Sequence, residues 1–359
     1  MSALATRYRW ARLITGISAL ACCVAPLPYV IEHPGPTIDV LGDYQDEELI
    51  TVNDPKDTGG PLRMTTVTIS GLPGDVIMAY PLTRAFFTST DAITPRELIF
   101  PEGQTAEENR EISRAQMNSS QESASVAALE AMGRTVVVSL EIAGIAEGAS
   151  AADVVDIGDI LLSVTPPGGT PVAGTSYRDI IQTMATIPPA TEVDIVVERD
   201  GQRLPLTVTT IEPPTLPDGT PERQGSLLGL ALYAHPDSDL GVDFGVGDRI
   251  GGPSAGLMFS LGIIDKLTPG PLTGTHDVAG TGTISLDGSV GPIGGIAQKL
   301  AGAKRDGAEY FLIPAANCAD AEGHVPDGLA GVRVETLADA LDAVKAIAAD
   351  RATALPTCD

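Results

Sequence analysis

The feature that most constrains this chain is a serine on a glycine-rich turn that opens a long apolar run. Residues 247–256 read Gly-Asp-Arg-Ile-Gly-Gly-Pro-Ser-Ala-Gly, and an apolar run from Leu257 to Leu267 follows directly. Proline suits the first turn of a helix because its ring fixes φ and it carries no N–H. The pattern predicts a helix with Ser254 near its N-terminus, where free backbone N–H groups can hold an oxyanion. The residues of this oxyanion turn would be Gly252, Pro253 and Ala255.

A second glycine-rich segment supplies the base that a serine nucleophile needs. Residues 291–300 read Gly-Pro-Ile-Gly-Gly-Ile-Ala-Gln-Lys-Leu, a turn that feeds a helix carrying Lys299. A free lysine is neutral in only about one molecule in 2,500 at pH 7, because its pKa is near 10.4. Burial can lower that pKa to roughly 7–8, and Ile296 and Leu300 beside Lys299 are apolar. Together, Ser254 and Lys299 predict a Ser-Lys hydrolase.

Each motif alone also fits a structural role, the first as a strand-to-helix turn and Lys299 as a solvated helix lysine. The order of the segments favours chemistry. Residues 277–285 read Asp-Val-Ala-Gly-Thr-Gly-Thr-Ile-Ser between the two motifs, and residues 307–314 read Gly-Ala-Glu-Tyr-Phe-Leu-Ile-Pro beyond them. From about Leu227 to Ala348, this order resembles the proteolytic domain of the Lon family.

The Lon resemblance assigns roles to three residues. It implies Ser254 as the nucleophile, Lys299 as the general base and Thr281 as the hydroxyl that orients the lysine. Lon domains usually read Thr-Gly-Glu where this chain has Thr281-Gly282-Thr283. Any role of that glutamate is therefore not carried over to this chain.

Other chemistries find little support in the sequence. Its four histidines, His33, His235, His276 and His324, lie outside Gly-x-Ser-x-Gly and trypsin-like contexts. There is no His-Glu-x-x-His motif or zinc-type cysteine spacing, so we predict no metal and no cofactor. A phosphate-binding loop motif is also absent, which predicts ATP-independent proteolysis, because ATP-dependent Lon proteases carry an ATPase module on the same chain. The net charge of −25 argues against nucleic acid as a partner.

The N-terminal residues predict a membrane anchor. Arg7, Arg9 and Arg12 precede an uncharged stretch, Leu13 to Ile31, that is long enough to cross a bilayer. Arginines before the stretch favour a cytoplasmic N-terminus. We therefore expect a single-pass anchor over residues 1–33 in the cell membrane, with the catalytic domain outside the cytoplasm. A cleaved signal peptide and a lipid on Cys22 are the alternatives.

The cysteines add a second expectation about this location. Cys22 and Cys23 lie in the anchor segment, which leaves Cys318 and Cys358 in the exported part. An even pair of cysteines outside the cytoplasm usually forms a disulfide. We predict a Cys318–Cys358 bridge that holds down the C-terminal tail, with two free thiols as the alternative.

The residues between anchor and protease divide into three predicted segments. Residues 34–129 read as a small α+β spacer, in which Thr105 and Glu108 form a capping box for a long helix. Residues 130–211 resemble a PDZ domain, with Gly158-Asp159 before a strand and an Asp200-Gly201 hairpin turn. PDZ domains bind extended peptides by strand addition, and the loop before Val136 would cradle the ligand; an ordinary α+β domain is the alternative. Residues 212–225 are a Pro-rich linker, and 226–359 the Lon-type protease domain.

The predicted fold class is α+β and multidomain: an N-terminal transmembrane helix, a small α+β region, a PDZ-like domain and a Lon-type proteolytic domain. This architecture resembles the membrane-anchored, ATP-independent Lon-like serine proteases of the YlbL type. The resemblance implies an endopeptidase acting on protein or peptide substrates at the extracytoplasmic membrane face, with the PDZ-like domain presenting them. Lon domains commonly form rings, so a homo-oligomer is a hypothesis. The rivals are a membrane-tethered PDZ adaptor with an inactive protease fold and a tail-specific Ser-Lys protease.

Overall fold

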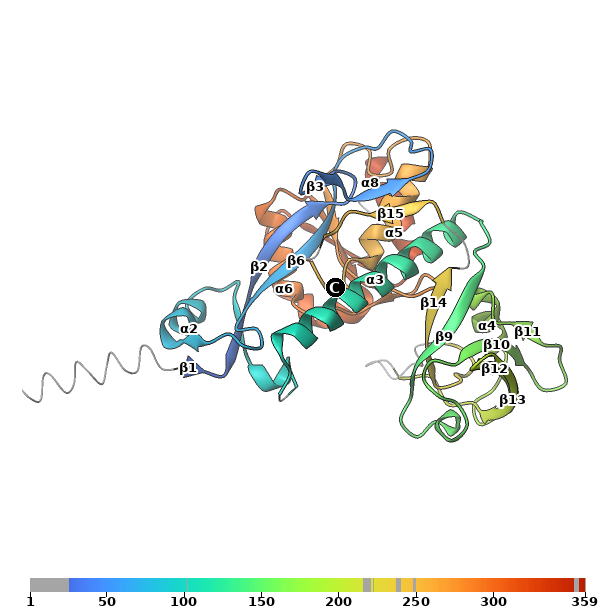
Figure 1. The fold of residues 1–359 in the computed structure, drawn as a ribbon. Helices are drawn as coiled ribbons and strands as arrows, with labels where there is room; N and C mark the ends of the chain where they lie inside the picture. The colour runs from blue at the N-terminus through green and yellow to red at the C-terminus, as the bar shows by residue number, and fades with distance from the viewer. Residues whose placement is uncertain are drawn as a thin grey trace, which may run out of the picture.

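A six-stranded mixed sheet forms the centre of the molecule. The computed structural model describes residues 26–101, 103–215, 221, 223–236, 240–247, 250–351 and 355–358. The sheet order is β20-β19-β16-β6-β2-β8 (Figure 1). Its strands are β2 (Tyr29–Asp39), β6 (Leu62–Ser70), β8 (Ala92–Pro95), β16 (Val278–Gly280), β19 (Tyr310–Pro314) and β20 (Ala330–Val334). The neighbours β6, β16, β19 and β20 are parallel, whereas β2 runs antiparallel to β6 and β8.

Helices cover both faces of this sheet, and we call the whole assembly the body. α5 (Gly256–Leu267) and α8 (Leu337–Ala348) pack on one face, and α6 (Ile296–Arg305) on the other. Side chains alternate accordingly along β19: Leu312 joins the α5 cluster, while Phe311 and Ile313 join the α6 cluster.

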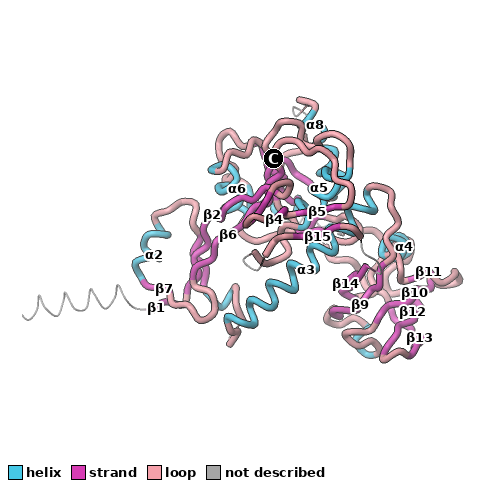
Figure 2. The backbone as a smooth tube through the Cα atoms, turned by 45° about the horizontal axis from the view of Figure 1, so that its top comes forward, coloured by secondary structure: helices cyan, strands magenta, loops and turns pink. Residues whose placement is uncertain are grey.

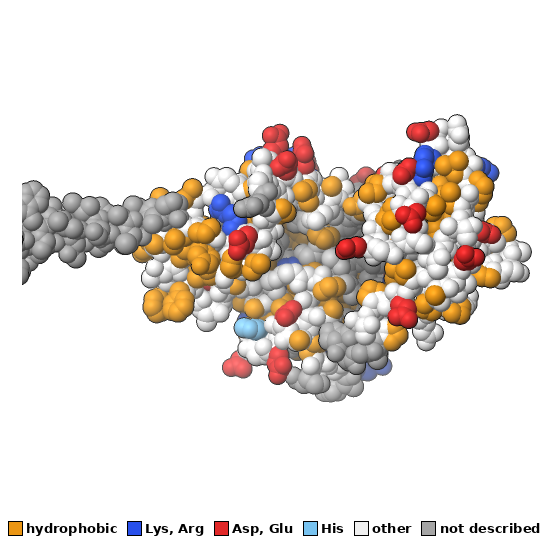
Figure 3. Space-filling model, turned by 90° about the horizontal axis from the view of Figure 1, so that it is seen from below, with side chains coloured by type: hydrophobic (Ala, Val, Ile, Leu, Met, Phe, Trp, Pro, Cys, Tyr) orange, Lys and Arg blue, Asp and Glu red, His pale blue; other side chains and the backbone are white. Residues whose placement is uncertain are grey.

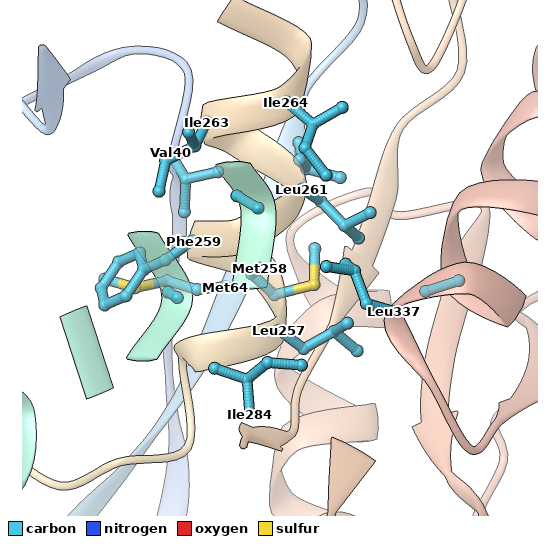
Figure 4. Close-up of a cluster of buried hydrophobic side chains, with 14 of the residues drawn as sticks. Val40, Met64, Leu257, Met258, Phe259, Leu261, Ile263, Ile264, Ile284 and Leu337 are labelled. Carbon is cyan, nitrogen blue, oxygen red and sulfur yellow. The ribbon is translucent and has the colours of Figure 1, made fainter. Parts of the chain in front are cut away.

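The apolar run after the serine turn forms the central helix of the body, as the sequence predicts. Figure 4 shows side chains of α5, among them Leu257 and Phe259, between residues of the sheet and of α8. Every residue from Gly256 to Lys266 is buried. A helix that is apolar all round belongs in a core, so the serine turn is attached to one of the most enclosed elements of the protein.

The predicted spacer over residues 34–129 is wrong as a separate region. Strands β2 and β6 lie within the central sheet, and β6 pairs directly with β16. β2 escapes sequence patterns because it contains Pro34 and Pro36, which cannot donate to a ladder, and its register shifts between Pro34 and Thr37. Thr66 Oγ1 donates to the Pro36 carbonyl over 2.7 Å beside this shift. The N-terminal strands and helix α5 therefore share one core.

The predicted anchor lies mostly outside the described residues. Residues 1–25, which include Cys22 and Cys23, are not described. The last residues of the uncharged stretch belong to β1 (Pro26–Leu27), which pairs with β7 (Ile77–Met78), and to the start of β2. Within the part of the chain that the structure describes, no helix is long and apolar enough to span a membrane.

Helix α3 (Ala106–Ala131) crosses the body diagonally and leads into a second unit (Figures 1 and 2). Its N-terminus has the predicted capping box: Thr105 Oγ1 accepts from the Glu108 N–H, and the Glu108 carboxylate accepts from the Thr105 N–H. Met117 and Ala124 of α3 pack in the body, whereas Val126 and Leu129 pack in the second core.

The second unit is a sheet of order β13-β12-β10-β9-β14 with helix α4 (Tyr177–Met184). Its strands are β9 (Val138–Ile145), β10 (Ile160–Thr165), β11 (Val172–Ala173), β12 (Glu192–Arg199), β13 (Gln202–Thr209) and β14 (Leu230–Pro236). Strand β14 lies beyond the predicted linker yet pairs with β9. A bridge between Ile211 and Leu227 joins the two ends of that linker. The second unit is thus inserted into the body, not placed before it.

Short elements complete the fold around these sheets. They are β3 (Asp43–Tyr44), β4 (Glu47–Glu48), β5 (Ile50–Val52), α2 (Ala79–Phe86), η1 (Arg96–Leu98), η2 (Ser150–Asp153), β15 (Val242–Phe244), β17 (Thr283–Ile284), β18 (Val290–Gly291), η3 (Ala315–Asn317) and α7 (Cys318–Ala321). Strand β15 pairs with β5 across 190 residues of sequence, between Val242 and Val52. The chain therefore re-enters the body beside its own N-terminal part.

The packing of α5 predicts a large effect of one truncation. Phe259 is 0% exposed, whereas Phe86 is 76% exposed. Phe259→Ala should lower the free energy of unfolding by about 3–5 kcal/mol, because it leaves a cavity as well as losing buried apolar surface. The matched control Phe86→Ala should change it by less than about 0.5 kcal/mol. Denaturant unfolding of both variants checks this, and equal losses would contradict the assignment of α5 to the core.

Candidate active site

The serine turn is held from behind by helix α3. The Gly252 N–H donates to the Ser113 carbonyl over 3.0 Å, and Ser120 Oγ donates to the Pro253 carbonyl over 3.0 Å. Gly252 has φ +86°, a conformation that glycine adopts without strain. These contacts fix the two residues before Ser254. Sequence reasoning missed Ser113 and Ser120, because residues more than a hundred positions away carry no local signal of their contact with this turn.

Thr281 and Gly282 hold the backbone of Ser254 from the other side. Thr281 Oγ1 donates to the Ser254 carbonyl over 3.0 Å, and the Gly282 N–H donates to the same oxygen over 2.9 Å. The Leu257 N–H donates in return to the Gly282 carbonyl over 3.1 Å. Ser254 itself is half-buried. The segment after β16 therefore positions the first turn of α5.

Lys299 reaches the same point from α6, on the opposite face of the sheet. Its Nζ donates to Thr281 Oγ1 over 2.9 Å, and the residue is 3% exposed. The turn before α6 is fixed by Asn317, whose side-chain amide exchanges two 2.9 Å hydrogen bonds with the backbone of Ile293. The structure thus joins the three predicted residues in one chain of contacts, from the Lys299 amine through the Thr281 hydroxyl to the Ser254 carbonyl.

Burial changes the acid–base chemistry of Lys299. The loss of solvent around its ammonium group lowers its pKa from 10.5 to about 7. Desolvation disfavours the charged form of a lysine, and within the described residues no carboxylate pairs with this amine to oppose the effect. A large fraction of Lys299 is therefore neutral near pH 7, as a general base requires.

Ser254 and Lys299 are not joined by a direct hydrogen bond between their side chains in the described part of the chain. Hydrogen bonds between catalytic groups often form only when substrate is bound. In this structure, Thr281 connects the backbone of Ser254 to the Lys299 amine.

The predicted oxyanion turn needs correction. The N–H of Gly252 is engaged by Ser113, and Pro253 has no N–H, so neither residue can donate to an oxyanion. The backbone N–H groups of Ser254 and Ala255 find no acceptor in the described part of the chain. They lie immediately before α5, where the helix dipole favours negative charge. The oxyanion donors available at this turn are therefore those of Ser254 and Ala255.

The cysteine pair and two of the histidines make contacts outside this site. Cys318 and Cys358 are joined by a disulfide with Cα atoms 5.1 Å apart, and both pack against the α6 cluster. His235 contacts Glu141 at 2.8 Å, and His276 contacts Glu309 at 2.9 Å. In the described ranges, no three His, Cys, Asp or Glu residues form a group that could hold a metal ion.

The open edge of the second sheet differs from the prediction. Strand β9 follows the loop before Val136, but it pairs with β10 on one side and β14 on the other. At Leu140 and Glu141, which pair on both sides, it therefore has no free edge for an added strand. β14 is the terminal strand of the sheet order, and the loop before it contacts α4, where the Ser226 N–H donates to the Met184 carbonyl over 3.2 Å.

The buried amine makes a prediction about stability. A lysine with pKa 10.5 when unfolded and about 7 when folded opposes folding below pH 7 by about 5 kcal/mol. Between pH 7 and 10.5 the unfolded chain binds more protons than the folded one, so this penalty decreases as the pH rises. Lys299→Met should therefore raise the free energy of unfolding by roughly 2–4 kcal/mol at pH 7, and by less at pH 10. Denaturant titrations at both pH values measure this; a less stable variant at pH 7 would contradict the burial penalty.

Comparisons with known proteins agree with the geometry of the site. Residues 236–349 match the family model of the Lon protease (S16) C-terminal proteolytic domain. Lon protease 2 of Bacillus subtilis (strain 168) is 38% identical over 108 residues, which are 30% of this chain and 19% of that protein. Lon protease of Escherichia coli (strain K12) is 44% identical over 78 residues, 22% of this chain and 10% of that protein. The match thus spans a fifth or less of these two relatives.

Similar solved structures include the PDZ domain of the SdrC-like protein from Listeria monocytogenes. It has 16% identity and a TM-score of 0.21, and the match covers 26% of this chain and 85% of that one. The family match rests on the segment that holds Ser254, Thr281 and Lys299. Residues 236–349 of this chain are therefore similar to the Lon protease (S16) C-terminal proteolytic domain.

Proposed function

We propose that this protein is a serine endopeptidase in which Ser254 is the nucleophile and Lys299 the general base. One observation carries the proposal. In a segment that matches the Lon proteolytic domain, a lysine buried to 3% exposure bonds to Thr281, whose hydroxyl bonds to the Ser254 carbonyl. A buried lysine with no acidic partner is unfavourable for stability, and such perturbed groups concentrate at functional sites.

The reaction follows from the groups present. The neutral Lys299 amine takes the proton of Ser254 Oγ while Oγ attacks the carbonyl carbon of a peptide bond. The N–H groups of Ser254 and Ala255 hold the resulting oxyanion. Lys299 then passes the proton to the leaving amine, the C–N bond breaks, and an ester on Ser254 remains. Water attacks this ester, Lys299 again accepts and returns a proton, and both groups are regenerated.

Substrates would be extended protein segments, because a peptide backbone must reach a half-buried serine. The second unit offers a place for such a segment: β14 ends its sheet, and α4 lies beside the loop before β14. A peptide added as a strand along β14 would use its free backbone groups. The surface is hollowed between the body and the second unit (Figure 3). Peptide binding at β14 is therefore the proposed role of the second unit.

Three further features belong to the same proposal. Cleavage would proceed without ATP, in line with the lack of a phosphate-binding loop motif in the sequence. The uncharged residues 13–25, which follow three arginines, favour an N-terminal membrane anchor before β1, with the body outside the cytoplasm. The protein would also assemble into a homo-oligomer, because Lon domains commonly form rings.

The proposed role of Lys299 as general base is tested by replacing it with arginine. Arginine keeps the charge of Lys299 but cannot lose its proton at any working pH. Lys299→Arg should therefore lower cleavage of unfolded casein about as far as Ser254→Ala, by at least about 1,000-fold. In the wild type, the rate should rise with pH through a pKa of about 7, because only the neutral amine accepts a proton. Rates with and without ATP should be equal.

Two control variants separate catalysis from folding. Lys304 lies on the same helix, where its amine donates to the Gly328 carbonyl at the surface, so Lys304→Arg should keep most activity. Thr281→Ser keeps a hydroxyl between Lys299 and Ser254 and should retain far more activity than Thr281→Val. A folded Lys299→Arg protein that still cleaves casein would remove Lys299 from the mechanism. A folded wild type that cleaves nothing would favour the adaptor alternative.

The proposed extracytoplasmic location is tested by the oxidation state of Cys318 and Cys358. Disulfides persist outside the cytoplasm and are rare within it. Protein isolated from cells with its thiols blocked during lysis should yield Cys318 and Cys358 in one linked peptide pair on mass spectrometry. Recovery of both cysteines as blocked, reduced thiols would contradict the extracytoplasmic location.

A further inference from the structure

One end of the body carries an exposed apolar patch that the peptidase chemistry does not use. It consists of six side chains between residues 76 and 98: Val76, Met78, Tyr80, Phe86, Phe87 and Leu98. Tyr80 is 72% exposed and Phe87 80%. Single exposed apolar residues are ordinary, but a clustered set marks an interaction surface. We call this set the apolar foot.

The foot is a built feature, because α2 has a separate buried side. Leu82 and Ala85 of α2 pack with Ile31 of β2 and Ile77 of β7 in their own small core. Phe86 and Phe87 end the helix with their rings edge to face, 5.3 Å apart. Packing of Leu82 and Ala85 therefore fixes which side of α2 faces outward and holds both phenylalanines in solvent.

The position of the foot points to a bilayer as its partner. Strand β1 begins at Pro26, and Pro26 pairs with Met78 of the foot. The residues that precede β1 in the sequence, 13–25, are uncharged, and Arg7, Arg9 and Arg12 come before them. Figures 1 and 3 show α2 and a gathering of apolar side chains at the end of the molecule where the described chain begins. A bilayer that holds residues 13–25 would lie against this end.

The charged residues of the foot indicate which kind of lipid surface it would bind. Between residues 75 and 98 the charged residues are Asp75, Arg84, Asp91, Arg96 and Glu97. Asp91 pairs with His33, and Arg96 donates to the Asp75 carbonyl. This mixture has no basic cluster of the type that binds anionic lipid. Aromatic and aliphatic side chains with few charges match the headgroup and acyl boundary of a zwitterionic bilayer, where such rings concentrate.

We propose that the apolar foot inserts into the outer face of the membrane and holds the body in one orientation beside its anchor. This inference rests on the membrane anchor in the proposed function. Insertion of Phe86, Phe87 and Tyr80 would bury the foot without a protein partner. With a second attachment point next to the first, the body could not rotate freely about the anchor.

A single-tryptophan experiment tests the foot in the full chain. The sequence has one tryptophan, Trp10. On a Trp10→Phe background, Phe87→Trp places a reporter in the foot, and Ile157→Trp places one at a 69% exposed apolar position of the second unit. Both proteins are reconstituted into phosphatidylcholine vesicles with and without brominated acyl chains, which quench tryptophan in the membrane. We expect quenching of Phe87→Trp to be at least about fivefold stronger than that of Ile157→Trp, with a blue-shifted emission.

Each outcome decides the proposal. Co-flotation with the vesicles and equal, weak quenching of both reporters would overturn the foot and leave the anchor intact. Blue-shifted emission of Phe87→Trp without quenching would mean that a second copy covers the foot, which also overturns it. Failure to co-float would overturn anchor and foot together. Casein cleavage in the same samples reports the peptidase separately, since the foot contributes no group to the Ser254 site.

Discussion

The burial of one amine, that of Lys299, is the constraint on which the site depends. An ammonium group at 3% exposure, with no carboxylate partner among the described residues, opposes folding by about 4 kcal/mol at neutral pH. This penalty also makes the lysine useful, because the same desolvation brings its pKa to about 7. The Thr281 hydroxyl satisfies one donor of the amine while adding no charge. A carboxylate in its place would restore the pKa toward that of free lysine.

The sheet explains why Thr281 stands between the other two residues. Ser254 precedes α5 on one face of the sheet, and Lys299 belongs to α6 on the other face. Groups on opposite faces can meet only where the sheet ends. Thr281 comes directly after the last residue of β16, a central strand, and its side chain lies at that end. Gly280, the last residue of β16, lies close to Met258 of α5. A Cβ atom added at Gly280 would lie 2.6 Å from Met258 Sδ.

Local patterns predicted the parts of this structure that depend on neighbours in sequence. The capping box of α3 and the Asp200-Gly201 hairpin turn between β12 and β13 form where the sequence predicts them. The sequence also pointed to Ser254 and Lys299, because a glycine-rich turn precedes an apolar helix segment at each, and the Lon resemblance added Thr281. What it missed is non-local. β2 is a central strand interrupted by prolines, β14 pairs across its own linker, and Ser113 and Ser120 support the serine turn from α3.

Helix α3 connects the second unit to the body, because it packs in the cores of both. Its middle part supplies Ser113 and Ser120, which hold the turn before Ser254. Its last residues, Val126 and Leu129, are buried in the core of the second unit. Between them, the Ala124 carbonyl accepts a hydrogen bond from Ser260 of α5 over 3.3 Å. Because one continuous helix serves both cores, removing the second unit would expose apolar residues of an element that positions the nucleophile. Helix α3 therefore packs against both the sheet of the second unit and the turn before Ser254, although these lie on different parts of the chain.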